Sequence, residues 1–188
     1  MAFGSGWEVP ESERGDLEYR WFRISGNRSL VLVMLSREPI WYRGHYDKGR
    51  MNPCLGDGCK LCSAKIGAQL RYVVAAAERS LHRVGLWEMG ATVARDLRDL
   101  AIRRGELRGS VVEISKHSLS KHSRMEIRLV DQTEGPWWME IDIPDIRRAL
   151  YLTWQGQGYD IPDWDPDKLP PEVETKRFQP PVFRKLHL

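Results

Sequence analysis

The sequence predicts a mainly β protein of the α+β class, with five strands in one domain and a helix between the third and fourth strands. A continuous apolar run at residues 29–35 is typical of a buried strand, and residues 124–130 alternate between apolar and polar side chains. Residues 89–104 repeat apolar side chains with the period of an amphipathic helix. These three patterns predict the fold class.

The first three strands are predicted from short apolar segments. The run SLVLVML at 29–35 is too short for a good helix, is rich in β-formers, and is bounded by Gly26-Asn27 and Pro39. Residues 69–78 and 81–87 indicate two further strands joined by a tight turn near residues 79 and 80. The AAAE stretch inside the second strand would also suit a helix.

The helix and the last two strands follow. At 89–104 one face carries apolar side chains and the other carries Arg and Asp, and Gly105 provides a C-terminal cap. Residues 110–116 and 124–130 predict a hairpin, whose Ser-rich connection HSLSKHS is basic. We expect a short strand to begin at residues 137–139 and a short helix to span 145–154.

The predicted domain is flanked by segments of different composition. We expect a flexible N-terminal arm at 1–17, a domain at 18–155, and an extended Pro-rich C-terminal tail at 156–188. Apolar residues make up 41% of the 188 residues and charged residues 29%, as in soluble globular proteins. The chain has neither a long apolar run nor a basic start with an apolar segment after it, so we expect a cytoplasmic protein.

The order strand, strand, strand, helix, strand, strand is that of a five-stranded Greek-key barrel of the OB type. Such barrels bind oligonucleotides across strands two and three and the neighbouring loops. The Cys-rich segment at 43–68 would then be an insertion between strands one and two. The basic connection of the last hairpin would be one of the binding loops.

All three cysteines of the chain lie within residues 43–62, which read RGHYDKGRMNPCLGDGCKLC. His45 precedes Cys54 by eight intervening residues, four more separate Cys54 from Cys59, and two separate Cys59 from Cys62. One imidazole and three thiolates suit a closed, structural, tetrahedral zinc site. Buried thiols or a redox-active CxxC pair are the alternatives. Other histidines could replace His45 as the fourth ligand, namely His82, His117 and His122.

This ligand order, inserted into an expected OB barrel and flanked by aromatic residues, resembles the zinc-containing, helix-destabilising single-stranded-DNA-binding proteins of tailed phages. The resemblance covers about residues 28–131 and is one of arrangement. It implies metal binding by His45, Cys54, Cys59 and Cys62. It also implies a DNA cleft lined by aromatic and basic residues, here Trp41, Tyr42, Tyr46, Arg71 and Tyr72. The ligand intervals are shorter here than in that family, and the chain ends FRKLHL where the family has an acidic, partner-recruiting tail.

Rings and cations alternate around the Cys-rich segment, which is the pattern that single-strand binding requires. We expect Trp41, Tyr46 and Tyr72 to stack on bases. We expect backbone phosphates to be contacted by Arg43, Lys48, Arg50, Lys116, Lys121 and Arg124. The sequence thus predicts a non-enzymatic single-stranded-DNA-binding protein of little sequence specificity, serving replication, recombination or repair. The tail could contact replication or recombination proteins.

The same residues are compatible with some other function classes and exclude others. A zinc-stabilised protein-interaction module, whose tail segment QPPVF docks on a partner, and an RNA-binding protein remain alternatives. The deaminase signature is absent because Tyr46 and Asp47 follow His45, and the chain has no P-loop and no GxGxxG motif. The acidic group at 160–167 lies in the Pro-rich tail and is expected to be solvated.

Overall fold

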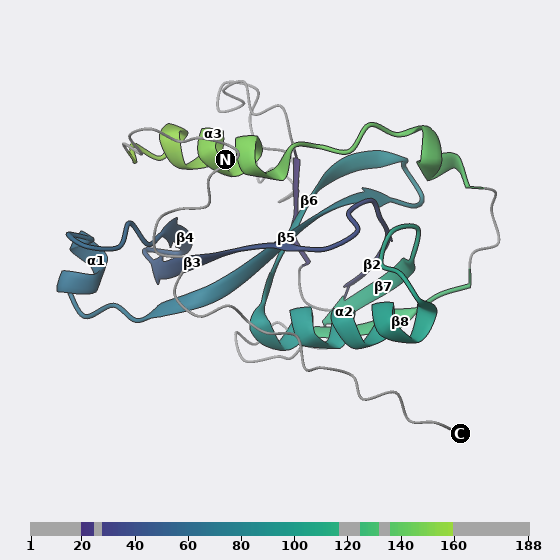
Figure 1. The fold of residues 1–188 in the computed structure, drawn as a ribbon, viewed down its shortest axis with the longest axis horizontal. Helices are drawn as coiled ribbons and strands as arrows, with labels where there is room; N and C mark the ends of the chain where they lie inside the picture. The colour runs from purple at the N-terminus through teal and green to yellow at the C-terminus, as the bar shows by residue number, and fades with distance from the viewer. Residues whose placement is uncertain (1–19, 25–27, 117–124, 132–135, 160–188) are drawn as a thin grey trace, which may run out of the picture.

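An open, mixed β-sheet of eight strands organises the fold (Figure 1). The structure is a computed structural model and describes residues 20–24, 28–116, 125–131 and 136–159. The strands are β1 (Arg20–Phe22), β2 (Arg28–Met34), β3 (Ile40–Asp47), β4 (Arg50–Pro53), β5 (Ala68–Glu78), β6 (Arg83–Gly90), β7 (Val111–Lys116) and β8 (Met125–Leu129). The helices are α1 (Lys60–Ser63), α2 (Ala91–Arg104), α3 (Ile146–Gly156) and the 3-10 helix η2 (Trp137–Glu140).

The strands pair in the order β1-β6-β5-β2-β7-β8, with β3 on β5 and β4 on β3. Strand β1 runs parallel to β6, and the other pairs are antiparallel. The long strand β5 pairs with β6 along one edge, whereas its other edge is divided between β3 and β2. At the division Ser36 inserts its hydroxyl, which accepts a hydrogen bond from the Ala75 N–H at 2.8 Å.

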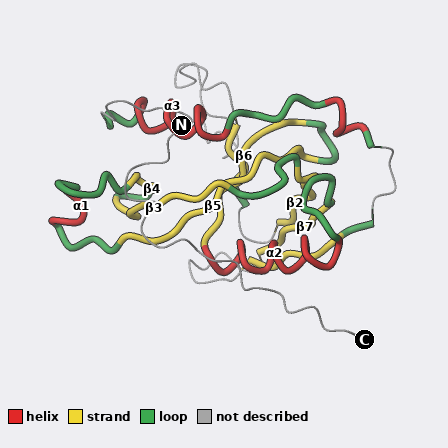
Figure 2. The backbone as a smooth tube through the Cα atoms, viewed as in Figure 1, coloured by secondary structure: helices red, strands yellow, loops and turns green. Residues whose placement is uncertain are grey.

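Both faces of the central strands β2, β5 and β7 are buried over much of their length, and this explains the continuous apolar runs. In β2, Leu32 and Met34 belong to the core under α2, whereas Val33 belongs to the core under α3. The Ala-rich part of β5 alternates in the same way between the two cores. Helices α2 and α3 lie on opposite sides of the strands (Figure 2). A strand that is covered on both sides needs apolar residues at every position.

Helix α2 begins two residues later than the sequence predicts, because Met89 and Gly90 end strand β6. Its buried residues Val93, Leu97 and Leu100 form the expected apolar face. Gly105 closes the helix with φ 97° and donates its N–H to the Ala101 carbonyl at 2.9 Å. This left-handed cap is the predicted one.

Helix α3 lies within one or two residues of the predicted 145–154. Asp145 caps it, because one carboxylate oxygen accepts hydrogen bonds from the N–H groups of Arg147 and Arg148 at 3.0 and 3.1 Å. Trp154, near its C-terminal end, packs edge-on against Tyr42 of β3, with ring centroids 5.1 Å apart. The C-terminal end of the helix therefore packs on the sheet where β3 pairs with β5.

Several sequence predictions need correction. The expected closed barrel does not form among the described residues: β8 pairs with β7 alone, and β1 lies along the outer edge of β6. Residues 137–139 form 3-10 helix η2 rather than a strand. The predicted strand at 69–78 is confirmed, because AAAE lies in β5. The described residues form eight strands rather than the predicted five, because the sequence patterns do not predict β1, β3 and β4. The predicted arm at 1–17 and the predicted tail beyond residue 159 lie outside the described residues.

No helix in the part of the chain that the structure describes has the length and apolar character needed to cross a membrane.

Candidate metal centre

The β3–β4 hairpin supplies the first candidate ligand, His45. Lys48 and Gly49, with φ 48° and 84°, form its two-residue turn. Asn52 is buried and its side-chain amide donates to the carbonyls of His45, Asp47 and Arg50 at 3.3–3.5 Å. These bonds hold the two strands together at the position where His45 lies.

The three cysteines come from the turn after β4 and from the start of α1. The Cys54 N–H donates to the Arg43 carbonyl at 2.9 Å, which fixes Cys54 beside β3. Gly56 and Gly58 have φ 75° and 82°, so the chain reverses there with residues that tolerate this conformation. The Cys59 N–H then closes the turn on the Gly56 carbonyl at 3.0 Å, and α1 brings Cys62 to the same side.

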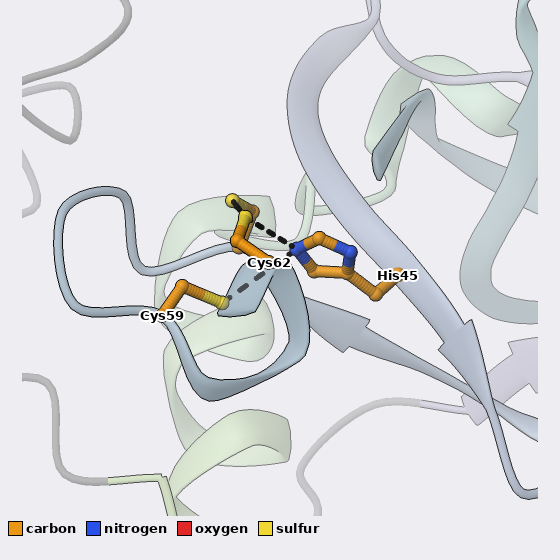
Figure 3. A group of neighbouring side chains, drawn as sticks. His45, Cys59 and Cys62 are labelled. Atoms are coloured by element: carbon orange, nitrogen blue, oxygen red, sulfur yellow. Dashed lines mark hydrogen bonds between the residues drawn. The ribbon is translucent and has the colours of Figure 1, made fainter. Parts of the chain in front are cut away.

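The four side chains converge on one point. Figure 3 shows the side chains of His45, Cys59 and Cys62 pointing toward one another. Nε2 of His45 lies 3.6 Å from Sγ of Cys59 and 3.4 Å from Sγ of Cys62. Sγ of Cys54 lies 3.6 Å from Sγ of Cys62, and all four ligand atoms lie within 4.8 Å of one another. A tetrahedral ion with metal–sulfur bonds of about 2.3 Å and metal–nitrogen bonds of about 2.0 Å has edges of roughly 3.5–3.8 Å. The cluster therefore has the dimensions of a four-coordinate metal site.

A disulfide does not explain these distances. A sulfur–sulfur bond is about 2.05 Å long, far shorter than the 3.6 Å between Cys54 and Cys62. All three cysteines are free. The predicted approach of His45, Cys54, Cys59 and Cys62 to one another is confirmed.

The second ring nitrogen of His45 orients the imidazole. Nδ1 lies 2.7 Å from the carbonyl oxygen of Ile66, which can only accept, so Nδ1 carries the proton. The lone pair of Nε2 consequently points toward the sulfur atoms. Metal-binding histidines are commonly held in this way by a second hydrogen bond.

The four ligands differ in how deeply they are buried. His45 and Cys59 are buried, with 0% and 4% of their surfaces exposed. Cys54 is half-buried and Cys62 is exposed. One side of the cluster is therefore covered by protein, and the Cys62 side faces solvent.

The sulfur atoms perturb one another's ionisation. Burial acts to raise the pKa of Cys59, but backbone hydrogen bonds from Cys62, Leu55 and Leu61 outweigh it and lower this pKa to about 6. The hydrogen bond with the Cys54 side chain, together with desolvation and the contact with Cys59, raises the pKa of Cys62 to about 11. Neighbouring thiolates repel one another, so a cation is needed for all three to ionise together.

The alternative histidines do not compete for the site in the described part of the chain. His82 lies in the β5–β6 turn and stacks on Trp137 of η2, with centroids 4.1 Å apart and an angle of 22° between the rings. His117 and His122 lie outside the described residues. Of the histidines that the structure places, His45 is the one grouped with the cysteines.

Two of the predicted nucleic-acid residues belong to a partly buried hydrogen-bond network on the α3 side of the sheet. Tyr42 is 6% exposed and its hydroxyl donates to Glu88 at 2.5 Å, while Nε of Arg71 lies 3.0 Å from the same carboxylate oxygen. Desolvation and the Glu88 charge raise the pKa of Tyr42 above its usual range. The structure therefore places Tyr42 in the core on the α3 side, and the Arg71 guanidinium in an ion pair with Glu88.

The other face of the same strands carries exposed rings and a cation. Trp41 on β3 lies opposite Tyr72 on β5, and Arg43 lies opposite Leu70. Trp41 is 37% exposed, Arg43 is exposed, and Tyr72 is half-buried against the core under α2. We call these four residues, Trp41, Arg43, Leu70 and Tyr72, the β3–β5 platform.

The remaining predicted contacts are dispersed. Tyr46, 58% exposed, lies at the tip of the β3–β4 hairpin with exposed Lys48 and Arg50. Lys116 ends β7 opposite Arg28 of β2, on strands other than those of the platform. Lys121 and Arg124 lie outside the described residues.

Sequence reasoning missed several residues that shape this region. Leu70 is a platform member whose exposure shows only once β3 is known to pair with β5. Glu88 joins Tyr42 to Arg71, and Asn52 ties the hairpin together. Tyr159 follows α3 and lies near Cys59. Burial is the largest effect on the pKa of Tyr159 and raises it, and the Cys59 thiol raises it further. Among these residues, Asn52 is the one that the sequence itself could indicate. A polar side chain between Met51 and Pro53 needs hydrogen-bond partners where it is buried.

Comparison of the chain with protein-family models, with curated proteins and with solved structures finds no match.

Proposed function

We propose that this chain binds single-stranded DNA with little sequence specificity, on a surface that a structural zinc ion holds in place. The observation that carries the proposal is the β3–β5 platform, which places exposed Trp41, half-buried Tyr72 and exposed Arg43 on the strands that lead to the four-ligand cluster. It is a binding function, for use in replication, recombination or repair, and not an enzymatic one.

Zinc is the ion that this ligand set favours. Three thiolates and one imidazole are soft or borderline ligands, whereas calcium and magnesium prefer oxygen. The distances suit a tetrahedron, and four protein ligands leave no open position for substrate or water. Zinc would be held by His45, Cys54, Cys59 and Cys62 and would fix the geometry of the hairpin and α1.

Charge also favours a polyanionic ligand. Residues 40–66, which we call the metal flap, contain five basic and two acidic residues, a net +3 that equals the net charge of the whole chain. Three thiolates with a divalent ion subtract only one charge from this total. The rest of the chain is neutral, so the positive potential is concentrated beside the platform. The basic residues of the flap are Arg43, Lys48, Arg50, Lys60 and Lys65, all exposed.

The platform chemistry matches unpaired bases rather than a duplex. Base–aromatic stacking contributes about 1–3 kcal/mol per base and tolerates any base, because every base has a π-face. Trp41 and Tyr72 face each other across adjacent strands, and Arg43 lies two residues along from Trp41. Bases in a duplex are already stacked and cannot use such a surface.

The order of the elements supports an OB-type ancestry. Strands β6, β5, β2, β7 and β8 pair in the order three, two, one, four, five of an OB barrel, and α2 separates the third from the fourth. OB folds are partly open barrels that bind oligonucleotides on strands two and three, here β5 and β6. With a histidine and three cysteines in the same chain order, the arrangement is similar to that of zinc-containing single-stranded-DNA-binding proteins of tailed phages.

The test is a titration of tryptophan fluorescence with oligo-dT, alongside gel-shift series on single-stranded DNA, single-stranded RNA and duplex. We expect quenching by oligo-dT that salt reverses, and a weaker response to duplex. Tighter binding to RNA would move the function to RNA binding. Absence of binding to any nucleic acid at low salt would leave a zinc-stabilised protein-interaction module, and the proposal would fail.

A further inference from the structure

The cluster is asymmetric in a way that a purely structural metal site does not require. Cys59 and His45 are buried and in contact through Sγ and Nε2, 3.6 Å apart. Cys62 is exposed, and Sγ of half-buried Cys54 lies 3.6 Å from its sulfur. The most exposed cysteine therefore has a second sulfur beside its own, on the side of the cluster that faces solvent.

We infer that Cys62 is an oxidation site for peroxides, and that its oxidation closes a Cys54–Cys62 disulfide that releases the metal ion. This inference rests on the proposed zinc site. It assigns an order to the three cysteines: Cys62 reacts first, Cys54 resolves it, and Cys59 stays reduced.

The chemistry balances with one peroxide per disulfide. The Cys62 sulfur attacks one peroxide oxygen, the O–O bond breaks, and a sulfenic acid forms while hydroxide leaves. The Cys54 thiolate then attacks the Cys62 sulfur, the S–O bond breaks, and a second hydroxide leaves. Two electrons pass from sulfur to peroxide, and both hydroxides take up protons to become water.

The geometry favours Cys54 over Cys59 as the resolving residue. A disulfide needs its sulfurs at about 2.05 Å, so Cys54 and Cys62 must approach by roughly 1.5 Å from their present 3.6 Å. The chain between them bends at Gly56 and Gly58, which adopt positive φ and leave the turn adaptable. Cys59 is buried, and the hydrogen bond from its N–H to the Gly56 carbonyl holds it at the covered side.

The consequence for the metal is release. A disulfide removes two of four ligands, and the remaining His45 and Cys59 cannot complete a tetrahedral site. Because the metal flap carries the exposed cations beside the platform, oxidation would loosen the surface proposed to bind DNA. Reduction by a dithiol would restore the ligands.

The experiment treats the zinc-loaded full chain with hydrogen peroxide and follows zinc with a chromogenic chelator. Free thiols are then alkylated without reduction, and the chain is cut with trypsin and with a protease that cleaves before aspartate. The sequence separates the cysteines completely, because cleavage after Arg50, Lys60 and Lys65 and before Asp57 gives the peptides 51–56, 57–60 and 61–65. We expect peptide 51–56 linked to 61–65, alkylated 57–60, and zinc release in step with the link.

Two variants isolate the exposed sulfur. Cys62→His keeps four ligands that zinc accepts but removes that sulfur, and it should release zinc roughly tenfold more slowly, since exposed thiolates oxidise fastest. His45→Cys also keeps four ligands and retains Cys62, so it should stay as sensitive as the wild type. If Cys62→His does not bind zinc, the inference is tested by which two peptides the disulfide links in the wild-type protein.

A link between 57–60 and 61–65, or zinc retained while free thiols in the same tube oxidise, would overturn the inference and leave the zinc site intact. A chain that takes up no zinc before any peroxide is added would overturn both the inference and the proposed zinc site. DNA binding is not among these readouts, so failure of the nucleic-acid proposal is measured separately.

Discussion

The hydroxyl of Tyr42 donates a hydrogen bond to the carboxylate of Glu88, 2.5 Å away across the sheet, and this bond faces α3. Its neighbour Trp41 faces the other way and lies opposite Tyr72. These two adjacent residues of β3 therefore have different roles. Tyr42 contributes to the fold, and Trp41 is available to a ligand.

Tyr42→Phe and Trp41→Ala test this separation. Removing the buried hydroxyl deprives Glu88 of a donor and should lower the free energy of unfolding by about 1.5–3 kcal/mol, with DNA affinity unchanged. Trp41→Ala should change stability by no more than about 0.5 kcal/mol but weaken oligo-dT binding by about 1–3 kcal/mol. Urea denaturation and fluorescence titration measure the two quantities. Equal effects of both variants on binding would contradict the assignment of the faces.

Metal removal should act locally before it acts globally. The metal flap depends on the ligand cluster, whereas β2 and β7 lie in the buried centre of the sheet. We expect a strong chelator to speed amide hydrogen exchange in residues 40–66 first, while exchange in β2 and β7 stays slow. Uniform loss of protection would show that the ion supports the whole fold, and unchanged exchange would show that no ion is bound.

Arg43 should contribute to affinity through phosphate contact. Arg43→Gln removes one exposed cation from the platform, so binding should weaken and the salt dependence of log K should fall in slope by about one unit. Arg104→Gln is the matched control, because Arg104 is an exposed cation in the last turn of α2, away from the platform. Equal losses from both variants would mean that net charge alone governs binding.

The parts of the fold that local sequence patterns mark could be predicted, and the parts that depend on non-local pairing could not. The helix at α2 and the hairpin of β7 and β8 follow from local periodicity and caps, so both are found near their predicted positions. The ligand cluster follows from the spacing of His45 and the cysteines. The pairing of β3 with β5 is non-local, and periodicity could not reveal that β3 exists or which face Tyr42 occupies. For the same reason the prediction of a closed barrel is wrong, since strand order alone does not determine closure.

A second consequence of pairing appears at Glu113 and Arg128, which lie opposite each other on β7 and β8. Nε of Arg128 lies 2.6 Å from a Glu113 carboxylate oxygen, and the Arg128 hydrogen bond, followed by one from Ser29, lowers the pKa of Glu113. A depressed pKa stabilises the fold above the unfolded pKa of about 4.3, and this contribution is lost as pH falls through the folded value.

Glu113→Gln should therefore lower stability at neutral pH and converge with the wild type in acid. The effect should be below about 1 kcal/mol, because Arg128 is largely exposed and solvent screens the pair. Thermal denaturation of both proteins from pH 7 down to pH 3 measures the difference. A gap that stays constant over this range would mean that the amide changes packing rather than charge.

Gly109 and Gly105 both have positive φ, at 75° and 97°, yet their surroundings differ. A Cβ at Gly109 would clash with the buried ring of Trp138, whereas a Cβ at Gly105 would meet no atom within 4 Å. Both alanine variants carry the cost of a left-handed backbone, about 1 kcal/mol. Gly109→Ala must in addition displace Trp138 and should lose roughly 1–3 kcal/mol more. Urea denaturation of the two variants gives this difference directly, and equal losses would mean that Trp138 can move aside without cost.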